Sequence, residues 1–213
     1  MFDLNKDIQS GLKKYSSLLL SEKEGKPIIE GIFTAHKGNI KIENYDVWIS
    51  FPVDYPYNLP IVIETSKKIF PRNATRHIFR NDTLCFGNLQ DVLRVCRKGI
   101  TFKWFLDNIL NTHLCREYVK DKTGVYPTGE RSHDTEGIWE GYYEIFKNNN
   151  KKKILKELEL MLTHNTFPKN RLCYCGLEKK YKRCHEILEC LVFDIGRKNV
   201  RQILKILKQD YEK

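Results

Sequence analysis

Hydrophobic residues recur every three or four positions over the first twenty residues, a spacing that places them on one face of an α-helix. The residues of this pattern are Leu4, Ile8, Leu12, Tyr15, Leu18 and Leu19. Asp3 lies directly before them, where its carboxylate can accept a hydrogen bond from the first helical turn. The pattern therefore predicts an amphipathic first helix that begins after Asp3 and includes Leu18 and Leu19.

From Ile28 onward, β-branched and aromatic residues form three runs separated by turn residues. The runs are PIIEGIFTA (27–35), IKIENYDVWISF (40–51) and LPIVIET (59–65), with HKGN and PVDYPYN between them. Gly, Pro, Asn and Asp in such short gaps are typical of turns. The sequence therefore predicts a three-stranded antiparallel meander.

Residues 67–99 show no sustained period, and we expect them to be mostly loop, with Cys85 inside. A second helix is predicted after Thr101, its N-cap, because one apolar stripe follows. The stripe consists of Phe102, Phe105, Leu106, Ile109, Leu110 and Leu114. After another loop, a third helix is predicted around Ile138, Trp139, Tyr142, Tyr143 and Phe146.

The purely polar segment KNNNKKK (147–153) marks a predicted domain boundary. Beyond it we expect a helix at 154–162, a cysteine-rich knuckle and two helices divided by Gly196. The fold class predicted for the chain is α+β, with an antiparallel meander flanked by helices. We expect one such domain at residues 1–148 and a small α-helical, zinc-binding tail at residues 149–213.

The tail contains the string CYCGLEKKYKRCH, in which four residues of metal-ligand type lie within 13 positions. Cys173, Cys175, Cys184 and His185 supply three thiolates and one imidazole, the ligand set of a closed structural Zn²⁺ site. A tail of this size has a small core, so metal binding would supply folding energy. The string resembles the SEC-C motif, a family of interaction modules, and we therefore expect no catalysis at this zinc.

Composition adds three constraints. A hydrophobic fraction of 41% supports a folded core, and 37 Lys and Arg against 27 Asp and Glu leave a net charge of +10. This charge is consistent with an acidic protein or nucleic-acid partner, and equally with a solvated lysine-rich surface. Neither a signal peptide nor an apolar run of roughly 18 residues is visible, so we expect a cytoplasmic protein without membrane contact.

The seven cysteines are an odd number, which in a reducing compartment favours metal or thiol chemistry over disulfides. Four basic side chains precede Cys85, namely Arg72, Arg76, His77 and Arg80. Basic neighbours lower the pKa of a thiol and favour the nucleophilic thiolate. The alternative is that Cys85 merely fills space, which is the common role of free cysteines and the one we expect for Cys96, Cys115 and Cys190.

A helix, a meander, the string FPVDYPYNLP and a long loop with a lone cysteine together resemble the ubiquitin-conjugating (UBC) fold over about residues 1–120. The residues that match its signature are Phe51, Pro52, Asp54, Tyr55, Pro56 and Pro60. The resemblance places Cys85 at the thioester-forming cysteine. The segment YPTGERSHDTEGIWEGYY (126–143) is more similar to bacterial relatives than to the eukaryotic enzymes.

One departure concerns the asparagine that the family places before its cysteine, because this chain has Thr75, Arg76 and His77 there. We expect His77 to take its role as a donor to the oxyanion, with Asn73 and Asn81 as alternatives. His133, which lies between Glu130 and Asp134, is the candidate for orienting or deprotonating an attacking amine. His113 is expected to be an ordinary surface residue.

The resemblance implies an acyl transferase that forms a Cys85 thioester with the C-terminus of a protein and transfers or holds it. The donor would be a ubiquitin-like protein or, in an antiphage defence operon, a cGAS-like nucleotidyltransferase. Because no nucleotide-binding glycine string is visible, we expect a separate activating enzyme. Two alternatives remain: an inactive UBC-like module that binds a protein tail, and a zinc-dependent nucleic-acid-binding protein.

Overall fold

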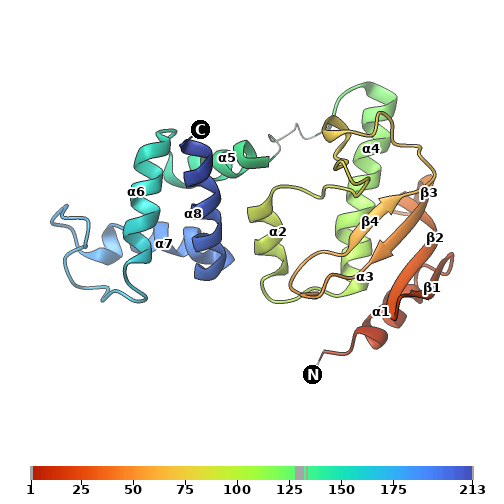
Figure 1. Cartoon of the computed structure of the whole chain (residues 1–213), viewed down its shortest axis with the longest axis horizontal. Coiled ribbons are helices and arrows are strands. Elements are labelled where there is room, and N and C mark those ends of the chain that lie inside the picture. Colours follow the sequence, from red (N-terminus) through yellow and green to blue (C-terminus); the bar gives the residue numbers. More distant parts are fainter. Residues whose placement is uncertain (1, 128–131, 133, 213) are drawn as a thin grey trace. The chain divides into compact units, whose positions relative to one another are not determined.

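The computed structural model describes residues 2–127, 132 and 134–212 (Figure 1). The chain is a mixed α+β protein that divides into two compact units. The first unit contains Met1–Gly87 and Lys98–Glu130, and the second contains Asn88–Arg97 and Arg131–Lys213. This division differs from the boundary expected between residues 148 and 149. The third predicted helix belongs to the second unit because its Trp139 and Tyr142 are buried in the core of that unit.

The first helix, α1, spans Leu4–Leu12, and the Asp3 carboxylate caps it by accepting a hydrogen bond from the Lys6 amide at 3.1 Å. The predicted cap is confirmed, but the predicted helix is too long. Residues Leu18–Lys23 form a strand, β1, which pairs with β2. The reason is the two-residue turn Glu24–Gly25, where both residues have positive φ, as tight hairpins require.

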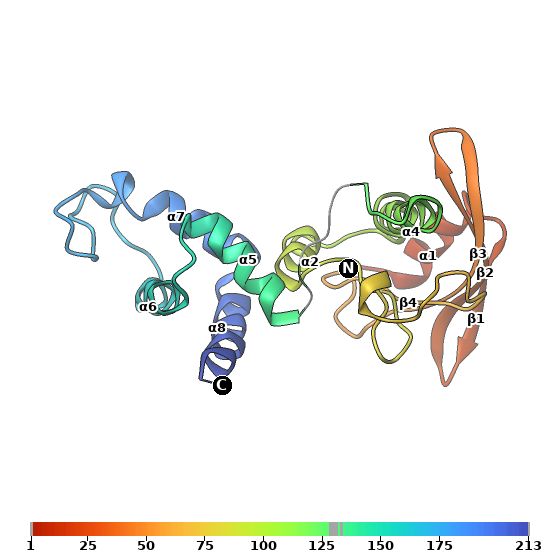
Figure 2. The same ribbon diagram turned by 90° about the horizontal axis from the view of Figure 1, so that it is seen from above.

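The three predicted strands are confirmed as β2 (Lys26–Lys37), β3 (Ile40–Ser50) and β4 (Ile61–Glu64). With β1 they form a four-stranded antiparallel sheet in the order β1-β2-β3-β4. Helix α4 packs across β2 and β3 (Figure 2). The side chains that form the buried part of the sheet include Ile29, Phe33, Val47, Ile49 and Val62.

The second predicted helix begins at its predicted cap, since the Thr101 hydroxyl accepts a hydrogen bond from the Trp104 amide at 3.2 Å. The helical segment consists of α3 (Phe102–Trp104), a π-helical stretch η2 (Phe105–Leu110) and α4 (Asn111–Thr123). Gly124 ends it in the left-handed conformation. All residues of the predicted stripe are buried except Ile109, which is half-buried. A π-helical stretch inside a helix is often found at functional sites.

The region expected to be mostly loop contains two helical segments. A short 3₁₀-helix, η1, spans Ala74–Arg76, and a helix, α2, spans Leu89–Cys96. The Asn88 side chain caps α2 by accepting a hydrogen bond from the Asp91 amide at 2.9 Å. Cys96 is fully buried, as expected for a packing residue.

The second unit is helical, with α5 (Asp134–Phe146), α6 (Lys151–Leu162), α7 (Glu186–Val192) and α8 (Arg197–Tyr211). Short 3₁₀-helices η3 and η4 span Tyr181–Arg183 and Phe193–Ile195. Gly196 separates the last two helices, as predicted. The apolar core of this unit includes Trp139, Leu158, Met161, Val200, Ile203 and Leu207. Across the residues described, we find no helix with the length and apolarity to cross a membrane.

We expect Gly31→Ala to destabilise the first unit more than Gly38→Ala does. Both glycines have positive φ, but a Cβ on Gly31 would also collide with the backbone oxygen of Ser17, whereas a Cβ on Gly38 meets open space. Urea unfolding should show a loss of about 1 kcal/mol for Gly38→Ala and more than about 2 kcal/mol for Gly31→Ala. Equal losses would contradict this account of the β1–β2 contact.

Candidate active site and metal centre

Cys85 and His77 are neighbours across a tight antiparallel loop. Ile78 pairs with Leu84, and the Cys85 amide donates a hydrogen bond of 2.6 Å to the His77 carbonyl. The Leu84 amide donates to the carbonyl of Val62 at 2.8 Å, which ties the loop to β4. The sheet therefore positions the backbone of the residue that precedes the cysteine.

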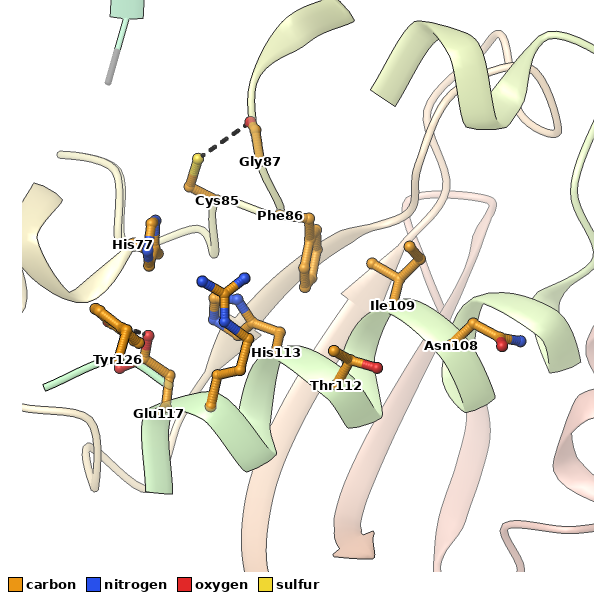
Figure 3. A pocket seen from close by; sticks show the side chains of 11 residues that line it. His77, Cys85, Phe86, Gly87, Asn108, Ile109, Thr112, His113, Glu117 and Tyr126 are labelled. Carbon is orange, nitrogen blue, oxygen red and sulfur yellow. Dashed lines mark hydrogen bonds between the residues drawn. The ribbon is translucent and has the colours of Figure 1, made fainter. Parts of the chain in front are cut away.

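Cys85 and His77 line a pocket of about 110 Å³ between this loop and the π-helical and α4 segments (Figure 3). The Cys85 thiol is half-buried and donates a hydrogen bond of 3.6 Å to the Gly87 carbonyl. The other lining residues are Phe86, Gly87, Asn108, Ile109, Thr112, His113, Arg116, Glu117 and Tyr126. The pocket thus combines one thiol with two imidazoles, one guanidinium and one carboxylate.

His113 is a buried pocket residue, and the expectation that it lies on the surface is wrong. Its side chain is 9% exposed. Burial lowers the pKa of His113 to about 3, helped by the nearby charges of His77 and Arg116. The imidazole is therefore neutral at every pH at which the protein would work. No apolar pattern marks this position, since His113 follows the polar pair Asn111 and Thr112.

A buried ion pair fastens the loop to helix α4. Arg76 is 6% exposed and Glu117 is 1% exposed, and Arg76 Nε lies 2.8 Å from Glu117 Oε2. Arg76 Nη1 also lies 3.1 Å from Asp121 Oδ1. The Tyr126 hydroxyl donates to the second oxygen of Glu117 at 2.5 Å, and its ring packs on His77 with centroids 5.1 Å apart.

These contacts change the expected electrostatics at Cys85. Arg76 is neutralised by Glu117, and Arg72 forms ion pairs with Glu64 at 3.0 Å and Asp82 at 2.7 Å. Arg80 is exposed in the turn of the loop. Most of the positive charge that precedes Cys85 in the sequence is therefore matched by carboxylates, and Arg116 is the cationic residue that lines the pocket.

Asn73 and Asn81, the alternatives to His77, are engaged within their own turns. The Asn73 side chain accepts hydrogen bonds from the amide and hydroxyl of Thr75, and Asn81 does the same for Thr83. His77 is thus the candidate that lines the pocket with Cys85. His133 and Glu130 lie outside the described residues.

The four predicted metal ligands lie together in the second unit. Their ligand atoms are within 4.8 Å of one another, and no other cluster of this kind occurs in the part of the chain that the structure describes. His185 Nδ1 lies 3.3 Å from Cys173 Sγ and 3.2 Å from Cys184 Sγ, and Cys175 Sγ lies 3.5 Å from Cys184 Sγ. Tetrahedral bonds of about 2.0–2.3 Å would separate such atoms by about 3.5–3.8 Å, so the arrangement is compatible with zinc.

Backbone hydrogen bonds shape the knuckle, the loop at residues 170–185 that carries the cluster. Gly176 has φ of 78°, and its amide donates to the Cys173 carbonyl at 3.3 Å. The Cys173 amide donates to the Lys179 carbonyl at 2.7 Å, which closes the loop between the two halves of the ligand set. The left-handed glycine lets the chain turn between Cys175 and the basic segment that follows.

A carboxylate orients the histidine of the cluster. His185 Nε2 lies 3.0 Å from Glu157 Oε2 of helix α6, while Nδ1 faces the sulfur atoms. Metal-bound histidines commonly donate their second ring N–H to a carboxylate, which fixes the tautomer and the ring. Sequence reasoning did not find Glu157, because it lies 28 residues before His185 in a helix rich in charged residues.

The remaining cysteines differ in their surroundings. Cys115 is half-buried, and its thiol donates to the His36 carbonyl at 3.4 Å, which is consistent with the expected packing role. Cys190 is exposed, and the expectation that it packs in a core is wrong. It lies on the outer face of α7, while Val192 of the same helix is buried.

Residues 170–187 match the SEC-C motif, a segment that includes all four residues of the cluster. No curated protein matches the chain.

The buried ion pair predicts a large difference between the two acidic partners of Arg76. Glu117→Ala leaves a buried cation without its main partner and should lower the free energy of unfolding by about 3–5 kcal/mol. Asp121 is half exposed, so the control Asp121→Ala should cost less than about 1 kcal/mol. Chemical denaturation of both variants measures the difference, and similar small losses would show that the pair does not hold the loop.

Proposed function

We propose that the chain is a ubiquitin-conjugating-like acyl transferase of bacterial type. Cys85 accepts the C-terminal carboxyl of a partner protein as a thioester and passes it to an amine, or holds it. The observation that carries the proposal is that a backbone hydrogen bond joins Cys85 to His77 and that both residues line one pocket with η2 and α4.

The order of elements in the first unit supports this reading. Helix α1, an antiparallel meander, the proline-rich turn after Phe51, the Cys85 loop and then helices follow one another as the resemblance to the UBC fold implies. The Tyr55 hydroxyl lies 2.5 Å from Asp7 Oδ2, and the same oxygen accepts the Phe102 amide at 2.9 Å. Asp7 of α1 thereby links the proline-rich turn to the start of α3.

The proposed chemistry is exchange between thioesters followed by aminolysis. The Cys85 thiolate attacks the carbonyl carbon of an incoming thioester, a new C–S bond forms, and the donor thiolate leaves. An amine then attacks the same carbon, a C–N bond forms, and Cys85 departs as a thiolate. His77 would donate a hydrogen bond to the oxygen that becomes negative in each step.

The partners follow from the resemblance and the chemistry. The acyl donor would be a ubiquitin-like protein or a cGAS-like nucleotidyltransferase of a defence operon, activated by a separate enzyme. The cluster of Cys173, Cys175, Cys184 and His185 would hold a structural Zn²⁺. When bound, the metal would stabilise the knuckle, and the basic residues around it would dock a partner.

A second candidate is a UBC-like module that binds a protein tail without chemistry. The observation that favours it is the neutralisation of Arg72 and Arg76 by carboxylates, which removes part of the cationic surroundings expected for an activated thiol. This candidate predicts that replacing Cys85 leaves partner binding and biological activity intact.

The test is the intact mass of the full chain produced with the genes that neighbour it in its host. Wild type should carry a protein-sized adduct that thiol reductant removes. Cys85→Lys should retain an adduct under reductant because an amide replaces the thioester, and Cys85→Ser should lose the reductant-sensitive species. Co-purification of a partner without any covalent adduct would favour the binding module instead.

The proposed zinc site predicts a role for Glu157. Glu157→Gln removes the carboxylate that orients His185, and zinc affinity should fall about 10–100-fold. The matched control is Glu159→Gln on the same helix, because Glu159 pairs with Lys208 at the surface. Competition with a chromogenic chelator measures both variants, and equal affinity in the two would refute the role of Glu157.

A further inference from the structure

His113 lines the pocket of Cys85 and carries a buried ring nitrogen. The residue lies on α4, one turn before Glu117, and Figure 3 shows it rising from the helix toward the cysteine loop. Its Nε2 is buried and has no hydrogen-bond partner among the residues that the structure describes. A buried polar atom left in this state is destabilising. Such an atom in a pocket is the kind of group that a ligand satisfies.

Aromatic contacts fix the His113 ring relative to Cys85. The Phe86 ring packs edge-on against His113 with centroids 5.2 Å apart and against Phe105 at 5.4 Å. Phe86 follows Cys85 directly in the chain, so the same ring anchors the cysteine backbone and the imidazole. The His77 ring lies 6.1 Å from that of His113. The orientation of His113 is therefore set by packing against Phe86 and His77.

The charge state of His113 limits what it can do. A pKa near 3 makes the imidazole a weak base at neutral pH, so it is poorly suited to remove a proton from an amine. In the tautomer with the proton on Nε2, the neutral ring is a hydrogen-bond donor. Neutral imidazoles serve as electrophilic donors to carbonyl oxygens in enzymes.

We infer that His113 is a catalytic residue of the proposed reaction, donating a hydrogen bond from Nε2 to the carbonyl oxygen of the acyl group on Cys85. This inference rests on the proposed function and adds a second donor to it. His77 approaches from the loop and His113 from the helix, so the two imidazoles bind the oxygen from different elements.

The donor acts when the amine attacks. As the new C–N bond forms, the carbonyl electron pair moves to oxygen, and the hydrogen bond from His113 strengthens. When the C–S bond breaks, the electrons return to form the carbonyl, Cys85 leaves as a thiolate, and the proton of the amine passes to solvent. Removal of one such donor typically slows the reaction about 10²–10³-fold.

The experiment loads the full-length protein at Cys85 with a short glycine-ended peptide thioester of a small thiol, which requires no activating enzyme. Excess free lysine is then added, and the discharge of the acyl group is followed by intact mass from pH 6 to pH 9. The proteins compared are wild type, His113→Gln and His113→Leu, with Cys85→Ser as the control for loading elsewhere. The melting temperature and the rate of alkylation of Cys85 by iodoacetamide are measured for each.

We expect His113→Leu to slow discharge about 100-fold while its alkylation rate stays near that of wild type. His113→Gln, which keeps a neutral N–H donor, should retain discharge within about tenfold of wild type, with a pH profile of the same shape. Should His113→Leu lose its native melting transition, His113→Met takes its place, because methionine adapts to irregular packing.

Two results would overturn the inference while leaving the proposed function standing: discharge at the wild-type rate in His113→Leu, or equal losses in the Gln and Leu variants. A wild-type Cys85 that accepts no acyl group under these conditions would overturn the proposed function and this inference with it. A pH profile of wild type that gains a step absent from His113→Gln would also contradict a neutral donor.

Discussion

The buried ion pair between Arg76 and Glu117 is the contact on which the geometry of the Cys85 pocket depends. Arg76 directly precedes His77, and Glu117 follows His113 by one helical turn, so the pair brings loop and helix together at both histidines. A charge this deeply buried is tolerated only with its partner in place. Because Glu117 neutralises Arg76, the nitrogen-bearing side chains that the pocket offers are two imidazoles and the guanidinium of Arg116.

In the second unit, the Cys/His cluster and its contact with Glu157 connect loop and helix as the buried ion pair does in the first unit. The helices of the second unit share an apolar core, against which Tyr174 of the knuckle between α6 and α7 packs. Local hydrogen bonds around Gly176 shape the knuckle, and the contact between His185 and Glu157 connects it to α6. The four residues of the cluster lie within 13 positions of the chain.

Features that depend on local sequence could be predicted, and features that depend on distant partners could not. The Cys/His cluster, the caps at Asp3 and Thr101 and the three central strands rest on short-range patterns. The sequence does not predict the strand β1, although Glu24 and Gly25 form a two-residue turn, because Leu18 and Leu19 also fit the helical spacing. The burial of His113 and the pairing of Arg76 with a residue 41 positions away depend on the tertiary fold.

A role of Cys85 in acyl transfer can be tested by the order in which the seven cysteines react with a small peptide thioester, mapped by proteolysis and mass spectrometry. We expect Cys85 to be acylated first, ahead of Cys190, although Cys190 is exposed and Cys85 is half-buried. Faster acylation of Cys190 would show that exposure alone governs reactivity. In that case the Cys85 pocket would not be an acyl-transfer site.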